Sequence, residues 1–97
     1  MGSTLRTISV GKGKTKAEVL ELLANELSFP NWWGKNWDAC WDCMTDPQLS
    51  DLPTHLNIIG IGPLRERLPN EAEVLVQILK DLDDARVDVS VSWAENE

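Results

Sequence analysis

The sequence predicts a small α/β domain in which a three-stranded parallel sheet carries packed helices. Segments of strand character near residues 5–10, 56–61 and 87–93 are separated by segments whose apolar residues recur at helical spacing. Strands that alternate with helices form parallel sheets, because a helical crossover returns the chain to the same end of the sheet. The expected element order is β-α-α-β-α-β. A chain of 97 residues builds one modest core, so residues 1–97 are expected to form a single domain.

Residues 5–10 alternate apolar and polar side chains and are expected to form the first strand, followed by a glycine-rich turn at residues 11–13. Thr15 is a favourable N-cap for the first helix, and Glu18 completes a capping box three residues later. Pro30 ends this segment because proline cannot donate the backbone hydrogen bond that another turn requires. The apolar residues at helical spacing are Ala17, Leu20, Leu23, Ala24 and Leu27.

Asn36 is a favourable N-cap for a second helix, expected from Trp37 to about Thr45 and followed by a loop over residues 47–55. The apolar run at residues 56–61 is expected to form the second strand.

Gly62-Pro63 is expected to break the second strand, and residues 62–69 have room for another helical turn. Asn70 is expected to cap a long helix. One face of this helix is expected to hold Val74, Leu75, Ile78, Leu79, Leu82 and Ala85. The alternating residues Val87, Val89 and Val91, before Trp93, predict the final strand.

The composition limits the classes of function. With 42% hydrophobic and 26% charged residues, the chain is typical of a folded soluble domain. The net charge of −7 argues against binding nucleic acid, because contacts to phosphates need a basic patch, and it favours a cationic partner. No apolar run is long enough to span a membrane and no signal-peptide pattern begins the sequence, so no membrane association is expected.

The acidic residues are unevenly distributed. Residues 36–64 contain no Lys or Arg. The aspartates of this stretch are Asp38, Asp42, Asp46 and Asp51. A second acidic run consists of Asp81, Asp83, Asp84 and Asp88.

The second helix separates into two faces when each residue advances 100° around its axis. The apolar arc comprises Trp37, Ala39, Cys40, Cys43 and Met44. The opposite face comprises Asp38, Trp41, Asp42 and Thr45. Like charges four residues apart cost roughly 0.2–0.5 kcal/mol, and an exposed indole is also unfavourable. Because neither helps folding, a function explains this face better than a plain solvated surface, an alternative that stays open.

Cys40 and Cys43 form a Cys-x-x-Cys pair, which raises a redox interpretation. A reactive pair has its first cysteine at a helix N-terminus, whereas Cys40 is expected one turn inside the helix. Two buried small side chains are therefore the favoured interpretation. With His55 as the single histidine, no metal and no cofactor are expected. Two cysteines at this spacing do not form a secreted disulfide framework, so a reducing cytoplasm is the expected location.

Asp38 and Asp42 raise two further interpretations. Acid–base catalysis needs carboxylates that face each other across a cleft, and two exposed acids on one helix face do not provide this, so no enzyme and no catalytic residue are expected. Protein recognition fits better, because carboxylates on a rigid helix can enter a site lined by Arg and Lys as a phosphate would. Trp41 beside them is a favourable anchor at the centre of an interface.

Residues 32–45, WWGKNWDACWDCMT, resemble the signature of the barstar-like ribonuclease inhibitors. That signature has two aromatics, Gly, a variable residue, Asn, an apolar residue, Asp-Ala, an apolar residue, Trp-Asp-Cys, an apolar residue and Thr. Residues 72–78 look like the third-helix segment of the family, and the resemblance is weakest over residues 46–70. It implies a small parallel sheet with packed helices. It also implies binding to a secreted nuclease or toxin inside the producing cell, with the active site of that enzyme blocked.

The resemblance also implies roles for individual residues. Asp42 matches the acid that occupies the phosphate site of the nuclease, and Asp38 and Trp41 match its neighbours in contact. The contacting loop is matched by Trp32, Gly34 and Asn36. The third-helix contacts are matched by Ile78 and by Asp81, which stands for a Glu of the family. Two departures concern Lys35, basic where an acid often stands, and residues 46–47, Asp-Pro in place of a Gly-aromatic pair.

The resulting hypothesis is a cytoplasmic inhibitor or immunity protein, monomeric when free, that binds a basic extracellular ribonuclease and occludes its active site. An immunity protein against a toxin of another chemistry, such as a different nuclease class or a nucleotide-modifying enzyme, would use the same face. A Cys-x-x-Cys oxidoreductase is less favoured. A plain scaffold domain would have no tight basic partner.

Overall fold

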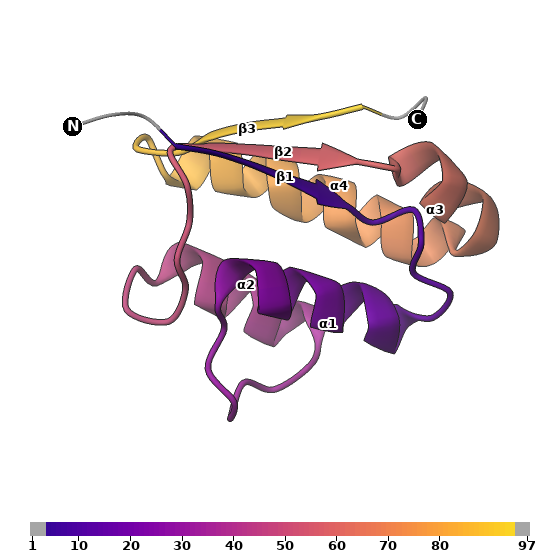
Figure 1. Cartoon of the computed structure of the whole chain (residues 1–97), viewed down its shortest axis with the longest axis horizontal. Helices are drawn as coiled ribbons and strands as arrows, with labels where there is room; N and C mark the ends of the chain where they lie inside the picture. The colour runs from indigo at the N-terminus through magenta and orange to yellow at the C-terminus, as the bar shows by residue number, and fades with distance from the viewer. Residues whose placement is uncertain (1–3, 95–97) are drawn as a thin grey trace.

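The three strands form one parallel sheet in the order β1-β2-β3 (Figure 1). The structure is a computed structural model, and it describes residues 4–94. The elements are β1 (Leu5–Ser9), α1 (Lys16–Leu27), α2 (Trp37–Thr45), β2 (His55–Ile59), α3 (Ile61–Arg67), α4 (Pro69–Ala85) and β3 (Ser90–Trp93). The predicted α/β class and parallel sheet are confirmed. The helical turn for which residues 62–69 had room is the separate helix α3.

The helices lie on one side of the sheet, with α4 close beneath the strands and α1 and α2 farther from them (Figure 1). On the covered side, Leu56 and Ile58 of β2 are fully buried. On the other side, the hydroxyl of Ser92 donates to Oδ1 of Asn57 at 3.0 Å and lies 3.0 Å from Nε2 of His55. Most parallel sheets are covered on both faces. This one alternates apolar and polar residues because only one face is packed.

The start of α1 is capped as predicted. Oγ1 of Thr15 accepts from the backbone N–H of Glu18 at 3.2 Å. The carboxylate of Glu18 accepts from the backbone N–H of Lys14 at 3.3 Å, one residue before the position expected for a capping box. At the other end, Ser28 adopts a left-handed conformation and the guanidinium of Arg6 in β1 donates to the carbonyl of Glu26. A cation therefore lies at the negative end of the helix dipole.

The predicted boundaries around α3 and α4 were wrong in two places. Gly62 and Pro63 do not end the second strand, which already ends at Ile59. They lie in the first turn of α3, where proline is tolerated because its missing N–H has no helical partner. Asn70 does not cap α4, which begins at Pro69 after Leu68. Proline at the first helical position fixes a helical φ, and α4 starts there without a side-chain cap.

The buried face of α4 also differs from the prediction. Val74 is 36% exposed and Ala85 is exposed. The buried residues are Ala72, Leu75, Val76, Ile78, Leu79 and Leu82. In α1, Ala17 is likewise exposed, and Val19 takes its place in the core.

The final strand begins later than its sequence pattern indicates. Val87 is 98% exposed, because residues 86–89 form a turn in which the N–H of Val89 donates to the carbonyl of Arg86 at 3.2 Å. Pairing with β2 begins at Ser90. Within residues 4–94, no helix combines the length and apolar character needed to cross a membrane.

Candidate binding surface on helix α2

Helix α2 has the two faces that its sequence predicts. Asn36 caps it, with Oδ1 accepting from the N–H of Ala39 at 2.7 Å, and the helix begins and ends at the predicted residues. Cys40, Cys43 and Met44 are buried against the core. Trp37 and Ala39, expected on the same apolar arc, are half-buried at its edge.

Asp38 and Asp42 are exposed one turn apart on the opposite face. Among residues 4–94, neither carboxylate takes part in a side-chain hydrogen bond or ion pair. Asp38 lies in the first turn, where the helix dipole favours an acid, but Asp42 lacks that compensation. The face is thus a pair of unneutralised like charges on a rigid helix.

Trp41 is less exposed than the helical pattern indicates. Its side chain is half-buried and packs partly against the core, so only part of the indole is accessible beside the two aspartates. Thr45 donates from its hydroxyl to the carbonyl of Trp41 at 2.8 Å and closes the last turn. The packing of the buried part of the indole on the core, and not this backbone contact, restrains the position of the Trp41 side chain.

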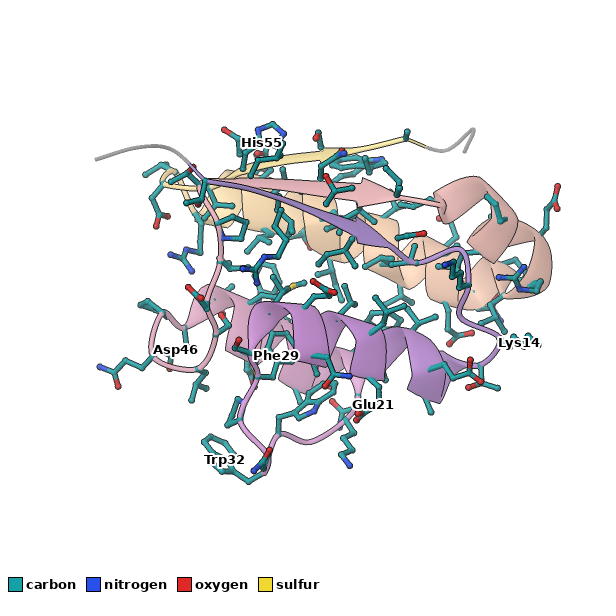
Figure 2. All side chains as sticks on the ribbon, viewed as in Figure 1. Lys14, Glu21, Phe29, Trp32, Asp46 and His55 are labelled. Carbon is teal, nitrogen blue, oxygen red and sulfur yellow. The ribbon has the colours of Figure 1, made fainter. Side chains whose placement is uncertain are left out.

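The loop before α2 presents one tryptophan and buries the other. Trp33 is 6% exposed and packs edge-to-face on Phe29, with ring centroids 5.1 Å apart. Trp32 is 73% exposed and points away from the fold at the tip of the loop (Figure 2). The buried ring therefore anchors a loop whose neighbouring ring is free to contact another molecule.

The same loop is held against the beginning of α2. The side-chain amide of Asn36 donates to the carbonyl of Gly34 at 3.4 Å, in addition to capping the helix. A Cβ added at Gly34 would lie 3.1 Å from Cβ of Ala39, so the close approach suits glycine. We refer to six residues of α2 and the loop before it, Trp32, Gly34, Asn36, Asp38, Trp41 and Asp42, as the α2 surface.

The arginines of the chain leave this surface negative, because each interacts elsewhere. The four arginines contact the carbonyl of Glu26 (Arg6), the carboxylate of Glu73 (Arg65), the carbonyls of Gly11 and Gly13 (Arg67), and the carbonyl of Met44 together with Asp88 (Arg86). Among the lysines, Lys14 lies at the end of the molecule opposite Asp46, the residue that follows α2 (Figure 2).

Three of the aspartates in the second acidic run make contacts within the protein. Asp83 accepts from the N–H of Val91 at 3.1 Å and so covers part of the open edge of β3. Asp88 pairs with Arg86. Asp81, a predicted contact, is exposed and accepts from the side-chain amide of Gln77 at 3.0 Å.

Ile78, the other predicted contact on α4, is 8% exposed and belongs to the core. It has little surface to offer a partner in this conformation. Its helical spacing with other apolar residues already indicated a core position, and the family resemblance alone suggested a contact.

The two cysteines lack the properties of a redox pair. Both are free and buried. Burial, and then the neighbouring Cys43, raise the pKa of the Cys40 thiol to about 12. Burial, followed by the charges of Asp42 and Asp46, raises the pKa of Cys43. Reactive cysteines have lowered pKa values and accessible thiolates, so the redox interpretation has no support here.

Two hollows within residues 4–94 lie away from the two aspartates. One, of about 430 Å³, runs along the outer side of α1 and is lined by residues that include Lys12, Glu18 and Leu22. Another, of about 110 Å³, lies between α1 and the loop before α2. Neither hollow is lined by Asp38 or Asp42.

Comparison with known protein families adds one finding. Residues 4–95 match the sequence model of the family described as barstar (barnase inhibitor). The comparison with curated proteins gave no match. The matched region covers nearly the whole chain, including all seven elements and the α2 surface.

Proposed function

The chain belongs to the barstar family of barnase inhibitors, and from this premise we propose that it binds a basic ribonuclease and occludes the active site of that enzyme with the α2 surface. The observation that supports this proposal most strongly is the pair of exposed, unpartnered carboxylates of Asp38 and Asp42 on one rigid helix face. Their mutual repulsion contributes nothing to folding. It is relieved when a cationic partner covers the face.

Asp42 is the central residue of the proposed contact. An active site that cleaves RNA binds phosphates through cationic side chains, and a carboxylate accepts the same charge-assisted hydrogen bonds as a phosphate oxygen. Asp38, one turn earlier, is placed to meet a second cation of the same site. Since α2 is capped and packed on the core, little conformational entropy is lost when the two carboxylates bind.

The tryptophans supply the apolar part of the interface. Trp32 is exposed on an anchored loop, and the accessible part of Trp41 lies between the two aspartates in the helix. Large aromatic side chains at the centre of an interface contribute strongly to affinity. Gly34 and Asn36 complete the contact through the loop backbone, and Asp81 is a secondary contact from α4.

Two measurements test the proposal. The first asks whether the protein inhibits the cleavage of RNA by barnase, and the second measures its affinity for barnase by calorimetric titration. We expect stoichiometric inhibition by the natural sequence. We expect Asp42→Ala to weaken binding by roughly 2–5 kcal/mol, a range to which the barnase–barstar pair itself contributes, because the cations of the partner lose their counter-charge. The free energy of unfolding of Asp42→Ala is expected to stay the same or rise slightly, since a like-charged neighbour of Asp38 is removed.

Glu66→Ala provides the matched control. It removes one exposed acid from α3, outside the α2 surface, so affinity is expected to change little. Equal affinities of Asp42→Ala and the natural sequence would contradict the proposed surface. Absence of inhibition of barnase and of every other basic ribonuclease in a panel would contradict the proposed function.

A toxin of another chemistry remains the second candidate for the same surface. The observation that favours it is Lys35, a cation in the loop of an otherwise acidic surface. Inhibition of a nucleotide-modifying toxin, with no inhibition of ribonucleases, would identify this case. In either case we propose that the protein acts as a monomer in the cytoplasm of the cell that makes the toxin. Its free cysteines suit that reducing compartment.

A further inference from the structure

Lys35 stands out by its charge. It is the single Lys or Arg between residues 17 and 64 of the sequence. It lies between Gly34 and Asn36, both part of the α2 surface, and three residues after the exposed Trp32. A partner that covers Trp32 and Asp38 therefore also reaches Lys35.

The backbone at Lys35 does not explain the choice of residue. Its φ is 57°, in the left-handed region that residues other than Gly, Asn and Asp rarely adopt. Gly or Asn would make the same turn with less strain. The long cationic side chain must therefore be accounted for by what it contacts.

The intramolecular contact of Lys35 is weak. Its Nζ lies 3.9 Å from Oε1 of Glu21 in α1, and the two side chains are 65% and 50% exposed. An ion pair this open to water is screened by salt and contributes little to stability. Lys35 thus remains available to another negatively charged group.

We propose that Lys35 is a specificity-determining residue that pairs with a carboxylate at the rim of the cationic site of the partner. This inference rests on the proposed function. When the α2 surface is covered, the ammonium group loses water, and it is stable in the interface only beside a counter-charge. A partner with cations throughout the facing region would repel it, so Lys35 selects ribonucleases that carry an acid at this position.

Charge reversal distinguishes this pairing from general attraction. Toward a uniformly basic partner, Lys35→Glu adds favourable charge and strengthens binding. Toward a partner with a carboxylate opposite Lys35, the same substitution places two acids together. With the basic ribonuclease that the natural sequence inhibits most strongly in the panel as the probe, we expect Lys35→Gln to weaken binding by up to about fivefold and Lys35→Glu by about tenfold or more.

Two controls isolate the role of the side chain. Lys14→Glu makes the same charge change at the end of the molecule far from Trp32, and it is expected to leave the affinity the same or to raise it slightly (Figure 2). Glu21→Gln removes the intramolecular ion pair but keeps Lys35, and it is expected to leave affinity unchanged or higher. Gln and Glu meet the same left-handed backbone as Lys, so urea unfolding of the two Lys35 variants is expected to match that of the natural sequence.

The outcomes separate this inference from the proposed function. Stronger binding by Lys35→Glu, or equal effects of Lys35→Glu and Lys14→Glu, overturns the inference while Asp42→Ala still weakens binding. Equal losses in Glu21→Gln and Lys35→Gln overturn it as well, because Lys35 would then act only by holding the loop. If Asp42→Ala has no effect, or no basic ribonuclease of the panel is bound, the proposed function fails and this inference fails with it.

Discussion

The guanidinium of Arg86 donates a hydrogen bond to the carbonyl oxygen of Met44, with Nη1 and the oxygen 3.3 Å apart, and so joins the end of α4 to the last turn of α2. The same guanidinium holds Asp88 through Nε and Nη2 at 3.2 and 2.7 Å. Helix α2 has no basic residue in its own last turn. Arg86 supplies a cation to the negative end of its dipole from 42 residues away in the chain. Arg86 therefore adds a polar contact between α4 and the acidic helix to the packing of α2 on the core.

Replacement of Arg86 is expected to destabilise the fold. Arg86→Ala leaves the Met44 carbonyl and Asp88 without their partner, and hydrogen bonds of a charged group contribute about 1.5–3 kcal/mol each in favourable cases. We expect the free energy of unfolding, measured in urea, to fall by about 1–3 kcal/mol. Lys80→Ala, which removes an exposed cation of α4, is expected to change it by less than about 0.5 kcal/mol. Equal effects of the two substitutions would show that the Arg86 contacts do not stabilise α2.

The pairing with Arg86 also predicts a dependence of stability on pH. The hydrogen bond from Arg86 lowers the pKa of the Asp88 carboxyl in the folded protein. A lowered folded-state pKa stabilises the protein above the unfolded value, about 3.9, and this stabilisation is lost as the pH falls through the folded value. The difference in unfolding free energy between the natural sequence and Asp88→Asn is thus expected to be constant near pH 7 and to shrink below about pH 4.

An Arg86→Ala background provides the control for this pH dependence. There the Asp88→Asn substitution is expected to produce a smaller acid-dependent difference, because the Arg86 donor is gone and only the backbone hydrogen bond of Asp88 still lowers its pKa. Urea unfolding at several pH values between 2 and 7 measures the effect of Asp88→Asn in the natural sequence and in the Arg86→Ala background. A difference that persists unchanged in the Arg86→Ala background would assign the acid dependence to another group.

Gly60 is expected to tolerate no side chain. Its φ is 86°, and an added Cβ would lie 2.5 Å from the backbone nitrogen of Gly11 and 2.9 Å from its Cα. Since backbone atoms cannot rotate aside, Gly60→Ala is expected to lower the free energy of unfolding by about 2 kcal/mol or more. Gly34→Ala, whose Cβ would meet only the side chains of Ala39 and Asn36, is expected to cost less. Thermal unfolding of both variants measures the difference, and the reverse order would contradict this account.

The buried thiols are expected to resist modification in the folded protein. Burial raises the pKa of Cys40 to about 12, so almost no thiolate exists at pH 8. An aromatic disulfide reagent is therefore expected to label neither cysteine quickly in the native state and to label both at once in urea. Gln48→Cys, in the exposed loop after α2, provides a rapidly reacting control. Fast native labelling of Cys40 and Cys43 would restore the redox interpretation.

The local features of α2 could be predicted from the sequence alone. Asn36, the apolar arc around Cys40 and the exposed Asp38 and Asp42 all follow from spacing, because caps and helix faces depend on residues within one or two turns. The α/β class follows in the same way from the alternation of strand and helix patterns. Errors arose where a local signal competed with a neighbour, as at Asn70, where the helix begins at Pro69, two residues before the start that an Asn70 cap would give.

The sequence by itself determined the order of strands and helices, the two faces of α2 and the negative charge of one of them, because short-range hydrogen bonds and helical periodicity are properties of neighbouring residues. The tertiary structure decided which acids remain free. The carboxylates of Asp83 and Asp88 accept from Val91 and Arg86, whereas no donor among residues 4–94 bonds to the carboxylate of Asp42. It also decided that Trp32 is exposed while Trp33 is buried. Contacts between segments far apart in the chain follow from packing, and no pattern within a single segment encodes them.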